Sequence, residues 1–195
     1  MNWKLVCLLA LIGYGGYQSY SKRAVQHEAG VLVAEAPVQQ SASSGAIQRN
    51  GYTITPVQAY QIEARVLSTK SYSTGRESDV SPLDLTLGWG QMSDEAVLST
   101  IRISQSNRFY FWSVDAFPIP REAIETQSAN VHMIPADAQV ADTLQSVRRG
   151  QVVTLTGELV NVSAPDGWHW KSSLTRTDTG NGACELMYVR RVDVR

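Results

Sequence analysis

A long β-type stretch with a glycine near its centre occupies the C-terminal third of the chain and restricts the folds that it can adopt. Residues 151–162 are rich in Val, Leu and Thr around Gly157, and a glycine inside a strand indicates a bulge or a bend. Turn residues at 165–167 separate this stretch from a predicted partner strand at 168–172, and residues 184–194 form a predicted last strand. The pattern is compatible with a small barrel of the OB type and, almost equally, with a twisted open sheet.

The middle of the chain predicts further strands and a few short helices. Apolar and polar residues alternate from Tyr60 to Leu67, and residues 101–103 and 108–114 also read as strands. Helices are predicted after Ser93-Asp94-Glu95, from Pro120 to about Ser128, and over residues 137–149. The predicted fold class is therefore α+β, with a mainly antiparallel sheet or small OB-like barrel and two or three short helices.

An apolar N-terminal run predicts a transmembrane anchor over residues 1–23. A spanning helix needs about 20 residues, and this length is reached if Trp3 and the tyrosines at 14, 17 and 20 lie at the membrane interfaces. A cleaved signal peptide is the alternative, although no small-residue cleavage site directly follows the run. The short N-terminal side favours a cytoplasmic N-terminus. We therefore expect the chain to cross the inner membrane once through residues 3–20, with a periplasmic C-terminal domain.

The next segment, residues 24–50, reads as a flexible linker because its Gln-, Ser- and Ala-rich part has no periodic apolar face. Residues 51–195 have the length and composition of a single globular domain. We expect this domain to fold without the first fifty residues.

Composition argues against several function classes. The net charge is −1, so the basic footprint of a nucleic-acid-binding protein is missing. Two cysteines, one of them in the apolar N-terminal run, cannot build a disulfide framework or a cysteine-rich zinc site. The sequence contains no phosphate-binding or dinucleotide-binding glycine motif. No cofactor, no metal and no nucleic-acid partner is therefore predicted.

The stretch from Trp168 to Glu185 is the richest in reactive side chains. In a catalytic interpretation, Cys184 or Ser173 is a nucleophile with His169 as its base. Asp178 and Glu185 could form a general acid–base pair, and Arg176 lies two residues before Asp178 in the same stretch. In a structural interpretation, which we favour, Asp178 and its neighbours are turn formers and Arg176 braces the loop.

Three tryptophans and a histidine are candidate binding residues. Trp168 and Trp170 share one face of their predicted strand and His169 points the other way. The two indoles belong either to the core, which we favour, or to an aromatic platform for a partner. Trp89, between two glycines, predicts a tight turn with a packed indole. His132 could approach His169, Cys184 and Glu185, but no metal-ligand spacing supports a metal site.

Three strings together resemble a known kind of protein: Leu87–Asp94, Ser128–Ala136 and Ser172–Glu185. With them the chain resembles a group of short bacterial proteins that have an N-terminal anchor and no assigned function. The resemblance covers residues 60–189. It implies a bacterial, membrane-linked domain, and it implies no activity, ligand or catalytic residue.

Two functions are compatible with these observations. The first is a non-enzymatic binding or assembly domain, tethered to the membrane, with a protein partner in the cell envelope. The second is a small cell-envelope hydrolase or ligand-binding enzyme that uses the Trp168–Glu185 stretch. The first agrees better with an anchor followed by a tether.

Overall fold

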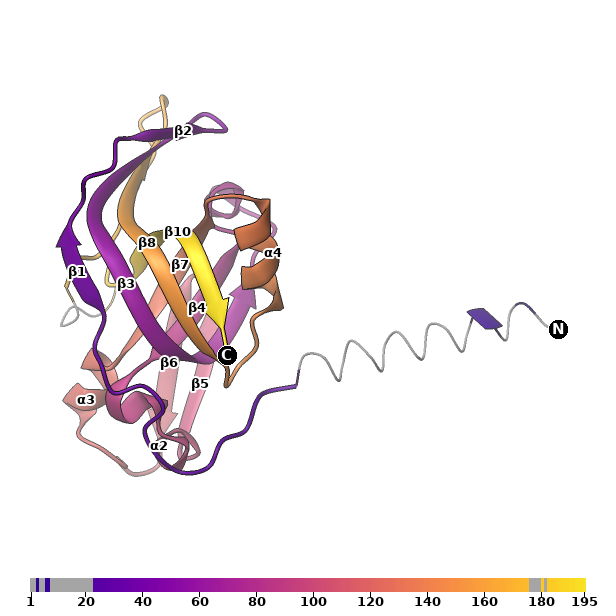
Figure 1. Cartoon of the computed structure of the whole chain (residues 1–195), viewed down its shortest axis with the longest axis vertical. Helices are drawn as coiled ribbons and strands as arrows, with labels where there is room; N and C mark the ends of the chain where they lie inside the picture. Colours follow the sequence, from indigo (N-terminus) through magenta and orange to yellow (C-terminus); the bar gives the residue numbers. More distant parts are fainter. Residues whose placement is uncertain (1–2, 4–5, 8–22, 176–179, 181) are drawn as a thin grey trace.

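The computed structural model describes residues 3, 6–7, 23–175, 180 and 182–195. Its elements are β1 (Val38–Ser41), β2 (Ile47–Arg49), β3 (Tyr52–Ser71), the 3-10 helix η1 (Arg76–Asp79), β4 (Leu83–Gly88), the 3-10 helix η2 (Gly90–Ser93), α2 (Glu95–Leu98), β5 (Ile101–Ser106), β6 (Phe109–Val114), α3 (Arg121–Thr126), β7 (Ser128–Pro135), α4 (Ala138–Ser146), β8 (Val152–Ser163), β9 (His169–Lys171) and β10 (Glu185–Val194). The described chain is mostly strand with short helices (Figure 1), which confirms the α+β class.

Five strands close into a ring in the order β3, β4, β7, β10, β8 and back to β3. The closing pair is β3 with β8, whose register runs from Thr53 opposite Ser163 to Arg65 opposite Val152. Four of the five neighbouring pairs are antiparallel and the fifth, β7 with β10, is parallel. The sheet is therefore closed rather than open, because β3 is long enough to pair with β4 along one part and with β8 along another.

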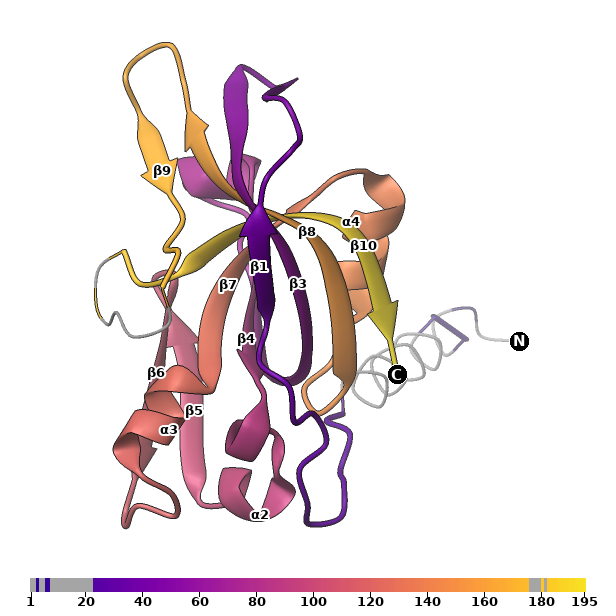
Figure 2. The ribbon, with the colours of Figure 1, turned by 60° about the vertical axis from the view of Figure 1, so that its left-hand side comes forward.

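The inward face of this ring holds the main core. Alternation places Leu83, Leu85 and Leu87 of β4 in the core cluster together with Val131 and Met133 of β7. The helix α4 lies beside β7 and β10 (Figures 1 and 2) and adds its own apolar face to this cluster. Asp137 caps this helix, since its side chain accepts a hydrogen bond from Val140 N–H.

Gly157 sits where two strands approach closely. A Cβ atom at this position would lie 1.9 Å from the carbonyl oxygen of Tyr188 on β10. The pairing of β8 with β10 shifts register next to this point, between Val189 and Arg191. The predicted irregularity is therefore present. Because Gly157 has no side chain, β10 can approach β8 closely at this point.

The segment predicted to be a flexible linker, residues 24–50, lies against the barrel. Strand β1 pairs with β3 along four residues (Figure 2) and β2 pairs with the start of β3. Val33 is buried in the main core, and Val25 N–H donates to the Arg149 carbonyl at 2.9 Å. The linker prediction is thus wrong for residues 25–49, because strand pairing and one buried valine fix a segment that has no periodic apolar face.

A second, smaller layer is inserted between β4 and β7. It contains η2, α2, the β5–β6 hairpin and α3, which enclose their own apolar cluster. The predicted cap of α2 is present, since the Asp94 carboxylate accepts from Ala96 N–H at 2.8 Å. The β5–β6 hairpin ends in a two-residue turn, Asn107-Arg108, with φ values of 51° and 69°.

No helix in the described residues combines the length and the apolar character that crossing a bilayer requires. The predicted anchor, residues 3–20, lies mostly outside the described part of the chain. It therefore stays a prediction.

Candidate functional site

Polar side chains line the outer face of β4 and β7, although this face is buried. Asp84 and Thr86 alternate with the core leucines of β4, and Asn130 and His132 alternate with the core residues of β7. The register sets Asp84 opposite His132 and Thr86 opposite Asn130. Buried polar groups are costly unless they are hydrogen-bonded, so this face needs a polar cover.

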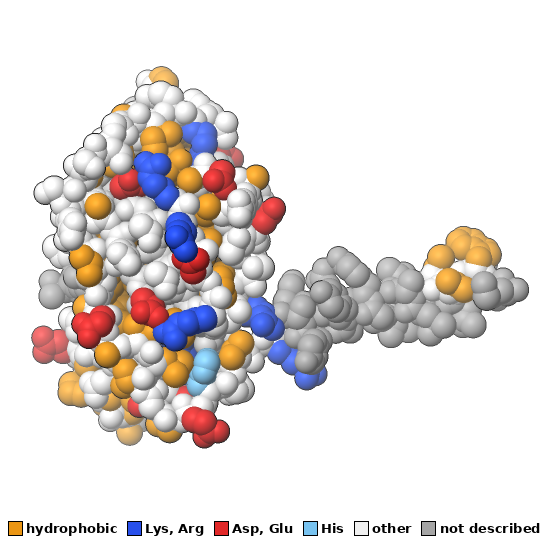
Figure 3. Space-filling model, viewed as in Figure 1, with side chains coloured by type: hydrophobic (Ala, Val, Ile, Leu, Met, Phe, Trp, Pro, Cys, Tyr) orange, Lys and Arg blue, Asp and Glu red, His pale blue; other side chains and the backbone are white. Residues whose placement is uncertain are grey.

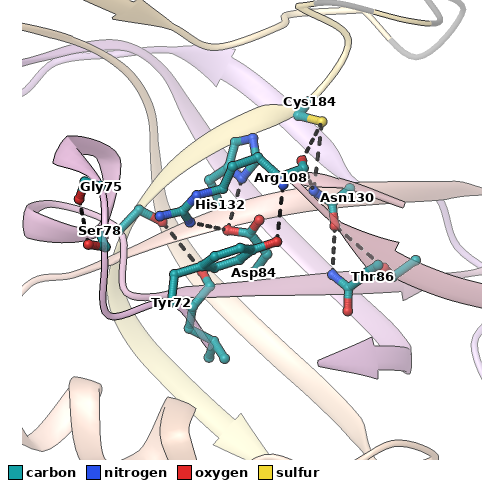
Figure 4. A network of polar contacts seen from close by, with 12 residues as sticks. Tyr72, Gly75, Ser78, Asp84, Thr86, Arg108, Asn130, His132 and Cys184 are labelled. Atoms are coloured by element: carbon teal, nitrogen blue, oxygen red, sulfur yellow. Dashed lines mark hydrogen bonds and ion pairs between the residues drawn. The ribbon is translucent and has the colours of Figure 1, made fainter. Parts of the chain in front are cut away.

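The turn of the β5–β6 hairpin supplies that cover (Figure 4). Nη1 of Arg108 donates to Oδ1 of Asp84 at 2.9 Å. The backbone of Arg108 also takes part, since its N–H donates to the Tyr72 hydroxyl at 3.1 Å and its carbonyl accepts from Asn130 Nδ2 at 2.9 Å. Asn107 and Arg108 both have positive φ, a conformation that costs energy for residues other than glycine. The contacts of the network hold the turn in this conformation.

Aromatic rings enclose the Arg108 guanidinium. Its Cζ lies 3.8 Å from the centroid of the Tyr72 ring and 5.7 Å from the Trp170 ring. Trp170 also contacts His132, with ring centroids 4.7 Å apart. Nδ1 of His132 lies 2.9 Å from Oδ1 of Asp84 but is not aligned for a hydrogen bond. Burial raises the pKa of the Tyr72 phenol, against the opposing effect of its hydrogen bond from Arg108 N–H.

Asn130 connects this charged group to a neighbouring set of neutral contacts. Its Oδ1 accepts from Gln105 Nε2 at 2.8 Å and from the Thr86 hydroxyl at 3.4 Å. The Cys184 thiol lies 3.7 Å both from Asn130 Nδ2 and from the Arg108 carbonyl oxygen. Asn130 therefore joins β4, β5, β7, the hairpin turn and the residue just before β10 in one network.

A groove of about 580 Å³ opens beside this network. It is lined by residues 109–114 of β6, Phe117, Arg121 and Glu125 around α3, residues 128–130 of β7, Thr175, Gly180 and residues 183–185. Phe111 and Phe117 are more than half exposed, and Phe117 meets Trp112 edge to face at 6.1 Å. Exposed aromatic side chains beside a cavity are a common feature of surfaces that bind a partner or ligand.

Polar contacts fix the floor and rim of the groove. The hydroxyls of Tyr110 and Ser128 are 2.6 Å apart, and Ser128 also donates to the Ile124 carbonyl. Burial raises the pKa of Tyr110, and the hydrogen bond with Ser128 partly opposes this. At the rim, Nε of Arg121 donates to Glu125 at 2.8 Å.

The predicted binding residues are found in three different settings. Trp168 and Trp170 lie on one side of their strand, with ring centroids 6.4 Å apart, and are partly buried against an apolar cluster. Trp89 is 2% exposed and packs in the core, as the tight-turn interpretation predicts. His132 is 3% exposed and belongs to the Asp84–Arg108 network. Only Trp170 among the tryptophans reaches that network.

The structure brings some of the predicted catalytic residues together: Ser173 N–H donates to the Cys184 carbonyl at 3.0 Å, and Glu185 follows Cys184 directly. His169 is exposed, with Nδ1 3.3 Å from the Gly167 carbonyl, whereas Cys184 contacts Asn130 and Arg108. Glu185 is 4% exposed at the start of β10. Arg176 and Asp178 lie outside the described residues, so their predicted bracing role stays a prediction. Within the described chain, no group of three or more His, Cys, Asp or Glu side chains is arranged to hold a metal ion.

Sequence reasoning did not identify Asp84, Arg108, Asn130 and the groove along β6 as parts of a site. One signal was present: Asn107 and Arg108 stand between two β-type runs, as in a two-residue hairpin turn. The aromatic run at 109–112 indicated a strand but not that, in the described chain, this strand pairs with β5 alone.

Comparison with known protein families, with curated proteins and with solved structures finds no match for this chain. The groove and the network beside it therefore carry the functional argument.

Proposed function

We propose that the chain is a non-enzymatic binding domain, tethered to the membrane, that takes up its ligand in the groove along β6. The observation that carries this proposal is the position of Phe111 and Phe117, exposed at a groove of about 580 Å³ whose inner wall is fixed by the Asn130 network. A rigid wall with exposed aromatic side chains loses little conformational entropy on binding.

The topology supports the same assignment. We assign the barrel to the OB type, because its third and fifth strands, β7 and β10, are parallel neighbours and α4 lies between the third and fourth strands. OB barrels bind ligands on the face of the second and third strands, which here are β4 and β7. The hairpin turn at Arg108 covers this face. The open ligand surface is then the groove next to it.

The charge of the chain agrees better with a protein partner than with a nucleic acid. On the face shown in Figure 3, basic and acidic side chains lie interspersed, and the net charge of the chain is −1. Nucleic-acid binding relies on a positive field. The charged residues on the groove rim, Arg121 and Glu125, pair with each other.

The hydrolase alternative has less support. Its nucleophilic form requires His169 to act on Cys184 or Ser173, and the exposed His169 contacts the turn at Gly167 instead. Ser173 is buried, and its hydroxyl donates to the Thr175 carbonyl.

The membrane tether depends on residues 3–20. Most of these residues lie outside the described part of the chain, so the tether is a proposal. Carbonate extraction of membranes and sequencing of the mature N-terminus test it. We expect the chain to stay in the membrane pellet with Met1 or Asn2 first. A mature chain that starts after Tyr17 would disprove the anchor.

Site-specific photo-crosslinking tests the binding function. A photoreactive phenylalanine analogue replaces Phe111 in the groove, exposed His169 on β9, or exposed Asp142 on α4. We expect discrete protein adducts from position 111 alone. Adducts from position 169 alone would favour a site in the Trp168–Glu185 stretch. Equal labelling at all three positions would contradict a groove-specific partner.

A further inference from the structure

We propose that β6 receives an additional β-strand from an extended, uncharged peptide segment of the partner protein. This inference rests on the proposed function, and it specifies how the partner binds. In such β-augmentation, main-chain hydrogen bonds to an open strand edge give affinity and side-chain pockets give specificity.

The strand β6 turns its edge toward the groove. All six residues of β6 line the cavity, and no residue of β5 does. Side chains of a strand alternate between its two faces. A cavity that contacts consecutive residues of β6 therefore lies along the edge of the strand.

The register shows which main-chain groups lie on this edge. Ser106 pairs with Phe109 across the two-residue turn, and such a closing pair exchanges both hydrogen bonds. Hydrogen-bonded pairs of this kind then recur at every second residue of β6, at Phe111 and Ser113. The N–H and C=O groups of Tyr110, Trp112 and Val114 point away from β5 toward the groove. In the described chain, β6 pairs with β5 only.

The opposite wall of the groove is also a strand edge. β7 pairs with β4 from Ser128 onward, but its pairing with β10 begins only at Val131 opposite Glu185. The second edge of residues 128–130 is therefore unpaired within the described residues, and these residues line the same cavity. An inserted segment would have main-chain partners on one side and β7 or its side chains on the other.

The sequence of β6 does nothing to block such pairing. Natural edge strands are protected by charged residues, proline or bulges. β6 reads Phe-Tyr-Phe-Trp-Ser-Val, and its register with β5 is continuous. An uncharged segment with apolar side chains matches these aromatic neighbours. The cavity of about 580 Å³ lies between α3 and residues 183–185, and this space suits one short strand better than the two-stranded hairpin of a second copy.

The test uses a defined peptide and the full 195-residue chain in mild detergent. Random seven-residue linear peptides displayed on phage are selected against the protein, and the strongest binder is synthesised. Its analogues each carry one N-methylated peptide bond, which removes one main-chain donor. We expect methylation at alternate positions to raise Kd about tenfold or more, and methylation at intervening positions to change Kd by less than about threefold.

A matched pair of protein variants locates the contact. Val114→Pro removes a main-chain donor on the groove edge, whereas Val114→Ala shortens the side chain and keeps the donor. We expect the proline variant to bind at least about fivefold more weakly than the alanine variant. If the proline variant does not fold, the methylation pattern on the peptide decides the question alone.

The remaining outcomes separate this inference from the proposed function. Crosslinks from position 111 together with uniform tolerance to N-methylation, or with no selected peptide, would overturn strand addition and leave the binding function intact. Neither crosslinks nor peptides would overturn both. A dimer in sedimentation that Phe111→Asp dissociates would show that a second copy, and not a peptide, occupies the edge.

Discussion

Arg108, at the tip of the β5–β6 hairpin, donates to Asp84 on the outer face of β4 at 2.9 Å, and the Asp84 side chain is fully buried. This contact fastens the inserted hairpin to the barrel. Because β6 belongs to the same hairpin, the position of the groove depends on the ion pair. The Asp84–Arg108 pair is therefore a connection between the stability of the domain and the geometry of its proposed site.

We predict that Asp84→Asn lowers the free energy of unfolding by about 3–5 kcal/mol, because it leaves the guanidinium of Arg108 buried without a counter-charge. Urea denaturation measures the change. The double variant Asp84→Asn/Arg108→Met should recover part of the loss. As a control, Asp115→Asn in the exposed pair with Arg102 should leave the urea midpoint unchanged. An unchanged midpoint for Asp84→Asn would contradict the role of the pair.

Gly157→Ala should destabilise the barrel by roughly 3 kcal/mol or more, because the added Cβ would lie 1.9 Å from the Tyr188 carbonyl oxygen and β10 would have to move. Thermal or urea melting measures the loss. Gly45→Ala is the control, since no heavy atom lies within 4 Å of a Cβ at that position. Equal stability of the two variants would show that the strands can separate at little cost.

The N-terminal segment should contribute to stability, contrary to its predicted role as a free linker. A chain that begins at Ala24 keeps β1, β2 and Val33, and one that begins at Gly51 loses them. We expect the shorter chain to be less stable by at least about 2 kcal/mol, from the burial of Val33 and its neighbours. Urea denaturation of both fragments measures the difference. Equal midpoints would restore the linker interpretation.

The buried Tyr110 should make stability depend on pH at the alkaline end. Burial raises the pKa of its phenol above the ordinary value of 10.0, so the folded state holds this proton more tightly than the unfolded state. The contribution of Tyr110 to the free energy of unfolding is therefore complete below about pH 10 and is lost as the pH rises toward the pKa of the folded state. We expect the urea midpoint of Tyr110→Phe to fall less steeply above about pH 10 than that of the wild type. Parallel profiles would contradict this.

Much of the local structure follows from short-range sequence signals. The cap of α2 could be read from Asp94, because capping depends on a side chain and the next three residues. The irregularity at Gly157 and the packed Trp89 were also readable. The residue types signal these features locally, whereas the contacts that Gly157 and Trp89 make come from distant parts of the chain.

Features that depend on distant partners could be decided only by the tertiary structure. The closure of the barrel needs β3 to meet β8, about a hundred residues later in the chain. The segment at 25–49 looked like a tether because its few apolar residues gain burial only when the barrel is already formed. Asp84 and Arg108 read as ordinary surface charges until the hairpin folds onto β4. The sequence by itself thus determined most of the longer strands, the cap of α2 and the turns, and within the described residues the tertiary contacts decided which polar groups are buried and how the strand edges pair.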